Sequence, residues 1–279
     1  MQFEFPWVLG PADGRFTIRE HLGETPSHVL VLHALGAPQR RRFAGRRPRA
    51  REAPPDPPAQ PVTTTRATLV DTAALSPDAA ARWLQSADLE AVARDALARL
   101  NRVLHAHRVA SADPHVREVA LGQALAVRVG FGSGELVSEG CWERARELPG
   151  AAPAGLRPRA AALRPQERLA ALLAGRDVAL ACEELTLRVR LDVDAGRWRE
   201  AALGLRVALE AALAELEPWR DAAGLAGRLA ELRERREDVD DVGVAALQGG
   251  LADEQIATVA FVLGRVEAAL RARVAGEGL

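Results

Sequence analysis

The sequence contains no lysine, and all 37 of its basic residues are arginine. It also contains no tyrosine, one methionine, one asparagine and two isoleucines, a bias typical of a GC-rich genome. Without lysine the chain cannot provide the phosphate-binding lysine of a P-loop, the strand lysine of a protein kinase or a lysine Schiff base. These three classes of enzyme are therefore excluded.

Cysteine and long apolar runs are also scarce. Cys141 and Cys182 are too few for a disulfide framework and lie outside any CxxC pair. No apolar run approaches the roughly 18 residues that would indicate a transmembrane helix. The opening MQFEFPWVLG lacks the basic and apolar segments of a signal peptide. We therefore expect a cytoplasmic protein with no membrane span, no metal and no cofactor.

The remaining composition suits a folded protein of one large domain or two modest ones. The chain has 279 residues, of which 48% are hydrophobic, and a net charge of −1. The pattern predicts a mostly helical α+β fold, in which a β-meander and a small α+β region precede an all-α helical bundle. The expected divisions are a β-meander at 1–37, an Arg/Pro-rich linker at 38–61, an α+β region at 62–150, a second linker at 151–164 and the helical bundle at 165–275.

The expected meander depends on alternation of apolar and polar residues. Phe3, Phe5, Trp7 and Leu9 occupy every second position, as on one face of a strand. The run 28–35, HVLVLHAL, is nearly continuous and predicts a strand buried on both faces. About 36 residues cannot support such a core alone, so we expect this piece to dock on the rest of the chain or on a second copy.

Residues 62–150 show strand and helix signals. Ser76 before Pro77 is typical of a helix start, and the glycines at 130–134 fit a hairpin turn better than a dinucleotide loop or a nucleophile elbow. The expected elements are a strand at 63–70, helices beginning at Pro77 and near Ala87, hairpin strands at 125–131 and 135–138, and a short helix at 141–148.

Beyond Pro165 the chain is expected to be wholly helical, because apolar residues recur every three or four positions. The positions 256–270 follow the spacing of a helix that packs lengthwise along another helix. We interpret this part as a bundle or short solenoid that presents a partner interface. The candidate interface residues are Trp198, Leu205, Ile256, Val259, Leu263, Val266 and Leu270.

One stretch of this part resembles a known repeat. GRWREAA at 196–202, followed by Ala208 and Leu209, is similar to the second helix of a tetratricopeptide repeat. The resemblance covers 180–213 and implies a helical hairpin with a peptide-binding groove. Leu213 stands where the family has proline, and no second copy follows at the period of about 34 residues.

The segment 38–61, PQRRRFAGRRPRAREAPPDPPAQP, holds the concentrated positive charge of the chain. Seven arginines face a single acid, Glu52, within residues 38–53. The segment is interpreted as a solvated linker, as an arm that binds nucleic-acid phosphates, or as an arm that docks on an acidic protein or lipid surface. The arginines concerned are Arg40, Arg41, Arg42, Arg46, Arg47, Arg49 and Arg51.

Three functions follow, in order of preference. The first is a non-catalytic cytoplasmic interaction or assembly protein that binds a protein partner or a second copy through its helical part. The second is a nucleic-acid-associated regulator that uses the Arg40–Arg51 arm. The third is a metal-dependent enzyme around residues 105–142, and its candidate residues are His105, His107, His115, Asp113 and Cys141. On a helix His105 and His107 point to different faces, so spacing alone does not assemble a metal site.

Overall fold

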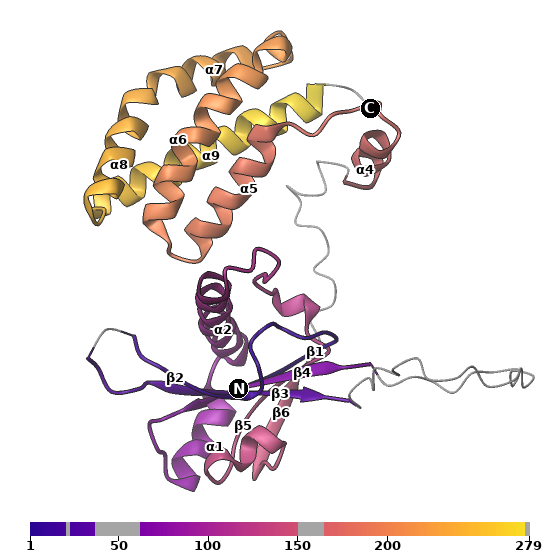
Figure 1. Cartoon of the computed structure of the whole chain (residues 1–279), viewed down its shortest axis with the longest axis vertical. Helices are drawn as coiled ribbons and strands as arrows, with labels where there is room; N and C mark the ends of the chain where they lie inside the picture. Colours follow the sequence, from indigo (N-terminus) through magenta and orange to yellow (C-terminus); the bar gives the residue numbers. More distant parts are fainter. Residues whose placement is uncertain (21–22, 37–61, 150–164, 277–279) are drawn as a thin grey trace, which may run out of the picture. The chain divides into compact units, whose positions relative to one another are not determined.

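The structure, a computed structural model, describes residues 1–20, 23–36, 62–149 and 165–276 (Figure 1). It divides into two compact units, Met1–Gly155 and Leu156–Leu279, each of which is described by itself. The mostly helical α+β class is confirmed, since a six-stranded sheet is followed by helices alone. The expected linkers at 38–61 and 151–164, including the seven arginines from Arg40 to Arg51, lie outside the described residues.

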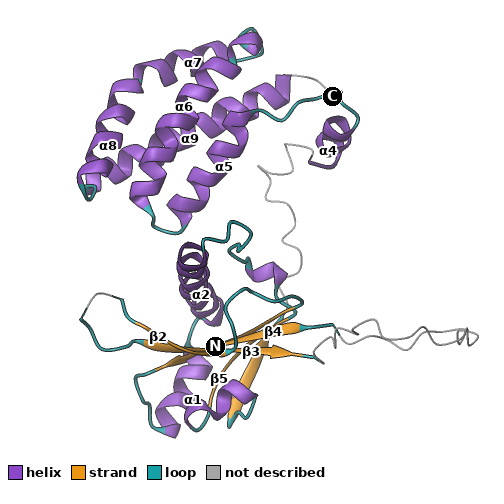
Figure 2. Cartoon of the chain, in the orientation of Figure 1, coloured by secondary structure: helices purple, strands orange, loops and turns teal. Residues whose placement is uncertain are grey.

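The N-terminal unit is an antiparallel sheet with two helices (Figure 2). The strands follow the spatial order β2-β3-β4-β1-β5-β6. The elements are β1 (Gln2–Phe5), β2 (Gly14–Ile18), β3 (His28–Leu35), β4 (Thr64–Asp71), α1 (Pro77–Ser86), α2 (Leu89–Ser111), η1 (Leu121–Gln123), β5 (Ala126–Phe131), η2 (Gly134–Glu139) and β6 (Arg144–Leu148).

The first strand lies inside the sheet and not at the start of a meander. Phe3 pairs with Ala67 of β4 on one side and with Val127 of β5 on the other. The expected β-meander at 1–37 is therefore wrong in its pairing, because only β2 and β3 are neighbours. The expectation that this piece docks on the rest of the chain is confirmed, and the predicted divisions 1–37 and 62–150 share one sheet.

Helix α2 packs on one face of this sheet. Its N-cap is Asp88, whose side chain accepts hydrogen bonds from the backbone NH groups of Glu90 and Ala91. The apolar side chains of the sheet and the inner face of α2 form one core, in which the buried aromatic pair Phe3 and Phe5 lies 6.2 Å apart. The principal members are Phe3, Phe5, Leu30, Leu32, Leu69, Val127, Ala93, Ala96, Leu100 and Leu104.

The chain between β5 and the end of the unit differs from expectation. Residues 135–138 belong to the 3-10 helix η2 and not to a strand, and 141–148 ends in strand β6 and not in a helix. Gly140, with a φ of 89°, closes η2 and turns the chain back toward β5. Opposite it, Gly130 pairs with Ala145 so closely that a Cβ at Gly130 would lie 2.3 Å from the carbonyl oxygen of Arg144. The close backbone approach of β6 thus overrides its helical composition.

The second unit is all helical. Its longest helix, α9, contacts α5, α6, α7 and α8, whose side chains close one continuous core. The elements are α4 (Pro165–Leu173), α5 (Ala181–Asp194), α6 (Trp198–Glu215), η3 (Glu217–Trp219), α7 (Leu225–Glu234), α8 (Arg236–Gln248) and α9 (Asp253–Gly276).

Helices α5 and α6 form a tight hairpin over the segment that resembles a tetratricopeptide repeat. Gly196, with a φ of 71°, lies in its loop. A Cβ at Gly204 of α6 would lie 2.9 Å from Cγ2 of Val189 in α5, so glycine is what permits this approach. The hairpin is a finding about the fold, and the tetratricopeptide resemblance stays a prediction.

The expected partner seam is covered within the chain. Val259, Leu263 and Val266 of α9 have no exposed surface, and Leu205 of α6 is 1% exposed. Trp198 and Leu270 are half-buried against the same core, and Ile256 is half-buried. The spacing correctly predicted a helix that packs lengthwise along others, but the partners are the chain's own helices. Side chains that are fully covered cannot contact a partner, so the seam is corrected to an internal packing surface.

Charged side chains at one end of α9 form a shared network of ion pairs. The guanidinium of Arg273, 1% exposed, donates to Asp177 at 2.7 Å and lies 3.5 Å from Glu183. Arg168 of α4 binds the same two carboxylates, at 3.0 and 2.6 Å. The Trp219 ring centre lies 4.5 Å from Arg273 Cζ, a cation–π distance. This ion network fastens α4 and the start of α5 to the end of α9.

Candidate functional site

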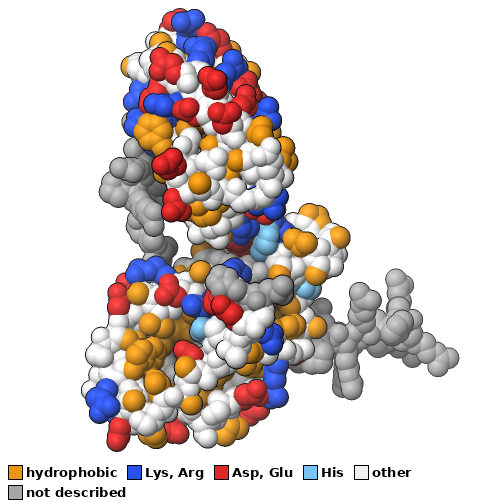
Figure 3. Space-filling model, turned by 90° about the vertical axis from the view of Figure 1, so that its left-hand side faces the viewer, with side chains coloured by type: hydrophobic (Ala, Val, Ile, Leu, Met, Phe, Trp, Pro, Cys, Tyr) orange, Lys and Arg blue, Asp and Glu red, His pale blue; other side chains and the backbone are white. Residues whose placement is uncertain are grey.

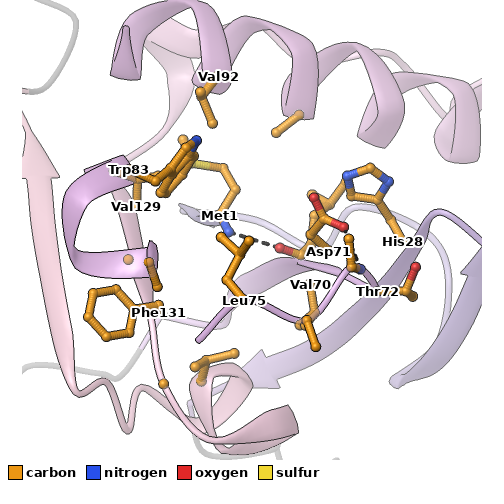
Figure 4. Close-up of a pocket in the computed structure, with 18 of the residues that line it drawn as sticks. Met1, His28, Val70, Asp71, Thr72, Leu75, Trp83, Val92, Val129 and Phe131 are labelled. Carbon is orange, nitrogen blue, oxygen red and sulfur yellow. Dashed lines mark hydrogen bonds between the residues drawn. The ribbon is translucent and has the colours of Figure 1, made fainter. Parts of the chain in front are cut away.

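A cavity of about 720 Å³ opens at one end of the sheet in the N-terminal unit (Figure 4). Strand β1 begins there, and its neighbours β4 and β5 end there, because both run antiparallel to it. Helices α1 and α2 and the segment after β5 complete the walls. The site is thus assembled from segments far apart in sequence, which meet only because β1 is inserted between β4 and β5.

Aromatic and aliphatic side chains form one part of the cavity. Trp83 of α1 and Phe131 of β5 lie on one side of Met1 (Figure 4). The apolar lining includes Met1, Leu69, Leu75, Ala80, Trp83, Val92, Val129, Phe131 and Trp142. Three of the chain's 11 aromatic residues therefore line one cavity. Such a wall binds the apolar part of a small molecule.

Polar side chains gather on the other side of Met1, where Asp71, His28 and Thr72 lie (Figure 4). His28 pairs with Asp71 across strands β3 and β4. Burial and the nearby Arg99 guanidinium lower the pKa of His28, against the opposing effect of Asp71. The imidazole is therefore neutral at pH 7, and the negative charge of Asp71 is not cancelled by it.

The backbone of Met1 forms the floor between these two parts. Its nitrogen donates to the carbonyl oxygen of Leu69 at 2.8 Å, and its carbonyl accepts from the NH of Leu69 at 2.7 Å. Burial lowers the pKa of the Met1 amino group to about 6, although the charge of Asp71 acts in the opposite direction. At pH 7.5 this amino group is uncharged.

Two more carboxylates, Asp95 of α2 and Glu143 after η2, line the same cavity. The positive charge nearby is Arg99, which is shared with Glu20 at 3.4 Å. Within residues 1–20, 23–36, 62–149 and 165–276, no arginine or histidine nitrogen lies within 4.0 Å of a carboxylate oxygen of Asp71, Asp95 or Glu143. The cavity therefore carries more negative than positive charge.

The surface view shows how hydrophobic and charged side chains are distributed over one face of each unit (Figure 3). Hydrophobic side chains gather on the visible face of the N-terminal unit, drawn in the lower part of the picture, where the surface is hollowed. On the helical unit charged side chains of both signs are spread over much of the visible face. An apolar hollow of this kind on a folded unit marks a binding surface more often than a random exposure.

The expected histidine site is not assembled. His105 lies 3.2 Å from a guanidinium nitrogen of Arg108 and 4.0 Å from Glu118, whereas the His107 ring packs near Gly10. Asp113 accepts from the backbone NH of His115 at 2.9 Å, as in a turn. Among the described residues no group of three or more His, Cys, Asp or Glu side chains could hold a metal ion.

Neither cysteine completes a site. Cys141 is an exposed free thiol of the N-terminal unit. Cys182 is buried in the helical unit, where burial, followed by its hydrogen bond with Glu215, raises its pKa to about 12. A thiol with such a pKa is protonated at neutral pH and is a poor nucleophile. The described part of the chain also contains no helix that is long and apolar enough to cross a membrane.

Sequence reasoning missed the cavity almost entirely. Gly132 and Gly134, predicted in a turn, and Cys141 border or neighbour it, but Trp83, Phe131 and Asp71 received no role. The usable signal was the scarcity of aromatics: outside residues 1–16 few are present, and Trp83 and Trp142 flank the β5 strand in sequence. The chain matches no protein-family model, and comparison with curated proteins and with solved structures gives no match either.

Proposed function

We propose that the N-terminal unit binds a small amphipathic organic molecule in the cavity at the end of the sheet. The observation that carries this proposal is one cavity of about 720 Å³ with an aromatic part and a carboxylate-bearing part. Ligand sites have this size and this combination of an apolar wall with a few placed polar groups. The proposal names binding and no reaction, since a nucleophile with its base is not assembled among the described lining residues.

A fluorescent apolar probe tests this proposal on the full chain. Nile red should bind with a saturable increase in emission, and Ala74→Trp should abolish it by filling the mouth of the cavity. Ala74 is exposed, so the larger side chain can be placed there without disturbing the core. The matched control is Ala106→Trp, at an exposed position of α2 away from the cavity. Equal binding by the wild type and Ala74→Trp would contradict the proposal.

The second candidate function is self-association of the helical unit, through exposed side chains and not through the buried seam of α9. Apolar side chains of α5, α6 and α8 are exposed although the core behind them is closed: Leu187 is 64% exposed and Leu247 is 64% exposed. The exposed set is Leu187, Leu191, Val207, Val244 and Leu247. Positive and negative side chains also lie on these helices, such as Arg206, which pairs with Asp240 at 2.6 Å. A surface that carries both signs suits a self-complementary contact with a second copy of this chain. The cytoplasm is the compartment proposed for both functions, since the two cysteines are free thiols.

Sedimentation velocity of the full chain tests this second candidate. A concentration-dependent dimer should be lost in the double variant Leu187→Glu, Leu191→Glu and kept in Val178→Glu, at an exposed apolar position outside the helices. A monomer at all concentrations would contradict it. Charged substitutions at Leu263 or Val266 are unsuitable, because burying them in the core would unfold the unit.

A further inference from the structure

We infer that the ligand of this cavity is an organic ammonium ion, with its apolar part against Trp83 and Phe131 and its ammonium group at Asp71. This inference rests on the proposed binding function and adds the chemical class of the ligand. It follows from the charges that the cavity presents and from where its aromatic side chains lie (Figure 4).

The charge balance favours a cation. Asp71, Asp95 and Glu143 contribute three carboxylates, whereas Arg99 is the guanidinium among the lining residues. Arg99 lies 3.4 Å from Glu20, a single carboxylate that is shared with Arg102 at 2.7 Å, so the lining carries three negative charges against one positive charge. The three carboxylates are exposed to solvent, so a neutral ligand meets no penalty from them, whereas an anionic ligand would be repelled by the net negative charge of the lining. A cation is attracted by the same net charge.

Asp71 is the carboxylate placed to receive the ammonium group. Its Oδ1 accepts from the backbone NH of Ala73 at 2.8 Å, which fixes the side chain at the end of β4. The opposite carboxylate oxygen has no hydrogen bond to another described residue. It can therefore accept from an N–H of the ligand, a charge-assisted bond that is stronger than one between neutral groups.

The aromatic part of the cavity fits the remainder of such a ligand. Trp83 and Phe131 lie across Met1 from Asp71, so the two ends of one small molecule would meet chemically different walls (Figure 4). The faces of aromatic rings also attract cations, which makes their neighbourhood compatible with positive charge. A primary ammonium group on an aromatic or aliphatic body meets both requirements.

Three probes of nearly equal size distinguish the ligand classes: phenethylamine, a cation at pH 7.5, 2-phenylethanol, which is neutral, and phenylacetate, an anion. Their dissociation constants for the full chain are measured by calorimetry and by competition with Nile red. We expect phenethylamine to bind at least about 10-fold more tightly than 2-phenylethanol, the factor that one charge-assisted bond provides, and phenylacetate to bind most weakly.

Asp71→Asn separates the charge from the fold, because an asparagine side-chain oxygen can still accept from Ala73. It should reduce the affinity for phenethylamine about 10-fold and leave that for 2-phenylethanol unchanged, whereas Glu90→Gln, at an exposed position of α2 outside the cavity, should change neither. Binding of 2-phenylethanol or phenylacetate in preference to phenethylamine would overturn the ammonium inference and leave the proposed function intact. Absence of binding by all three probes and by Nile red would overturn both.

Discussion

In the helical unit the buried carboxylates Asp177 and Glu183 are each covered by two arginines, whereas in the N-terminal unit Asp71 and Glu143 face a cavity with no arginine within ion-pair distance in the described chain. The helical core is closed, and the N-terminal unit leaves about 720 Å³ unfilled. The N-terminal unit also pairs charges, such as Glu4 with Arg66 and Arg128, but the carboxylates at the cavity have no ion-pair partner in the described chain. The number of charged residues therefore says little about function until their partners are known.

The largest loss of stability should come from breaking the buried ion network of the helical unit. Arg273→Ala leaves Asp177 and Glu183 short of a buried partner, so the helical unit should lose about 3–5 kcal/mol of its free energy of unfolding. Hydrogen exchange of α4 to α9 in increasing urea measures this loss. Arg265→Ala on the same helix removes a half-exposed pair with Glu231 and should cost less than about 1 kcal/mol. Equal costs for the two variants would contradict the role assigned to the network.

Enlarging a side chain should distinguish the two interiors. Ala212→Leu in the closed core, where Ala212 has no exposed surface, should cost about 1–3 kcal/mol through overpacking. Ala80→Leu adds the same atoms at a cavity-lining position and should change the stability of the N-terminal unit by less than about 1 kcal/mol, while weakening Nile red binding. Hydrogen exchange of each unit reads both variants. A similar loss at Ala80 would mean that the cavity is not available space.

The hairpin glycines provide a finer test within the helical unit. Gly204→Val places its side chain against Val189 and should destabilise the unit by about 1–3 kcal/mol. At Gly264 of α9 a Cβ would meet nothing within 4 Å, so Gly264→Ala should stabilise the helix by up to about 1 kcal/mol. Urea midpoints of the two variants should move in opposite directions. A stabilising Gly204→Val would show that the close approach of α5 and α6 is not needed.

Acidification should weaken ammonium binding before it affects the ion network. The pKa of His28 lies below its ordinary value and that of the Met1 amino group is lowered to about 6, so both groups are neutral at pH 7.5 and gain protons on acidification. Their positive charges offset the negative charges of Asp71, Asp95 and Glu143 and repel a bound ammonium group. The charge of Arg99 stays the same over this pH range. The affinity for phenethylamine should therefore fall between pH 7 and pH 5, that for 2-phenylethanol should not, and His28→Gln should lose part of the effect. A flat profile would contradict this.

The ion network responds in a lower pH range. Burial alone would raise the pKa of Asp177, but the hydrogen bonds from Arg168 and Arg273 outweigh it and hold that pKa below its ordinary value. The stabilisation is therefore complete above the unfolded pKa of about 3.9 and is lost as the pH falls through the lower, folded value. The cavity thus changes at mild acidity, whereas the helical unit stays closed.

The arginines that lie outside the described residues should have the smallest effect on the stability of the two folded units. If the arm at Arg40–Arg51 binds nucleic acid, a fluorescent single-stranded oligonucleotide should bind the full chain with an affinity that falls steeply between low and moderate salt. Replacing all seven arginines by serine should abolish that binding. Absent or salt-independent binding would leave the arm as a linker and would not affect the two folded units.

The sequence predicted those elements whose signals are local. Strand β3 has the expected bounds, Ser76 caps α1, and the spacing from 256 to 270 lies within one helix, α9. It failed where distant pairing decides: Arg144–Leu148 carries helical composition but is held as a strand against β5. An apolar stripe on a helix looks the same in sequence whether it packs on another helix of the chain or on a partner protein. The sequence therefore could not decide whether Leu263 lies in the core or at an interface. The cavity joins residues such as Asp71 and Phe131, whose proximity no local pattern contains.

The position of β1 also determines when the sheet of the N-terminal unit can form during synthesis. Gln2 pairs with Thr68 and with Arg128, so the sheet is incomplete until the chain has been made as far as β5. In a ribosome-bound chain this first strand must wait, unpaired, for partners made much later, and non-local pairings of this kind fold slowly. In the second unit α5 packs on its sequence neighbour α6, but α9 packs on α5, α6 and α7 as well as on α8, so this core also closes only when the last helix has been made. During synthesis the N-terminal unit precedes the helical unit, and the edges of β1 stay unpaired until β4 and β5 have been made.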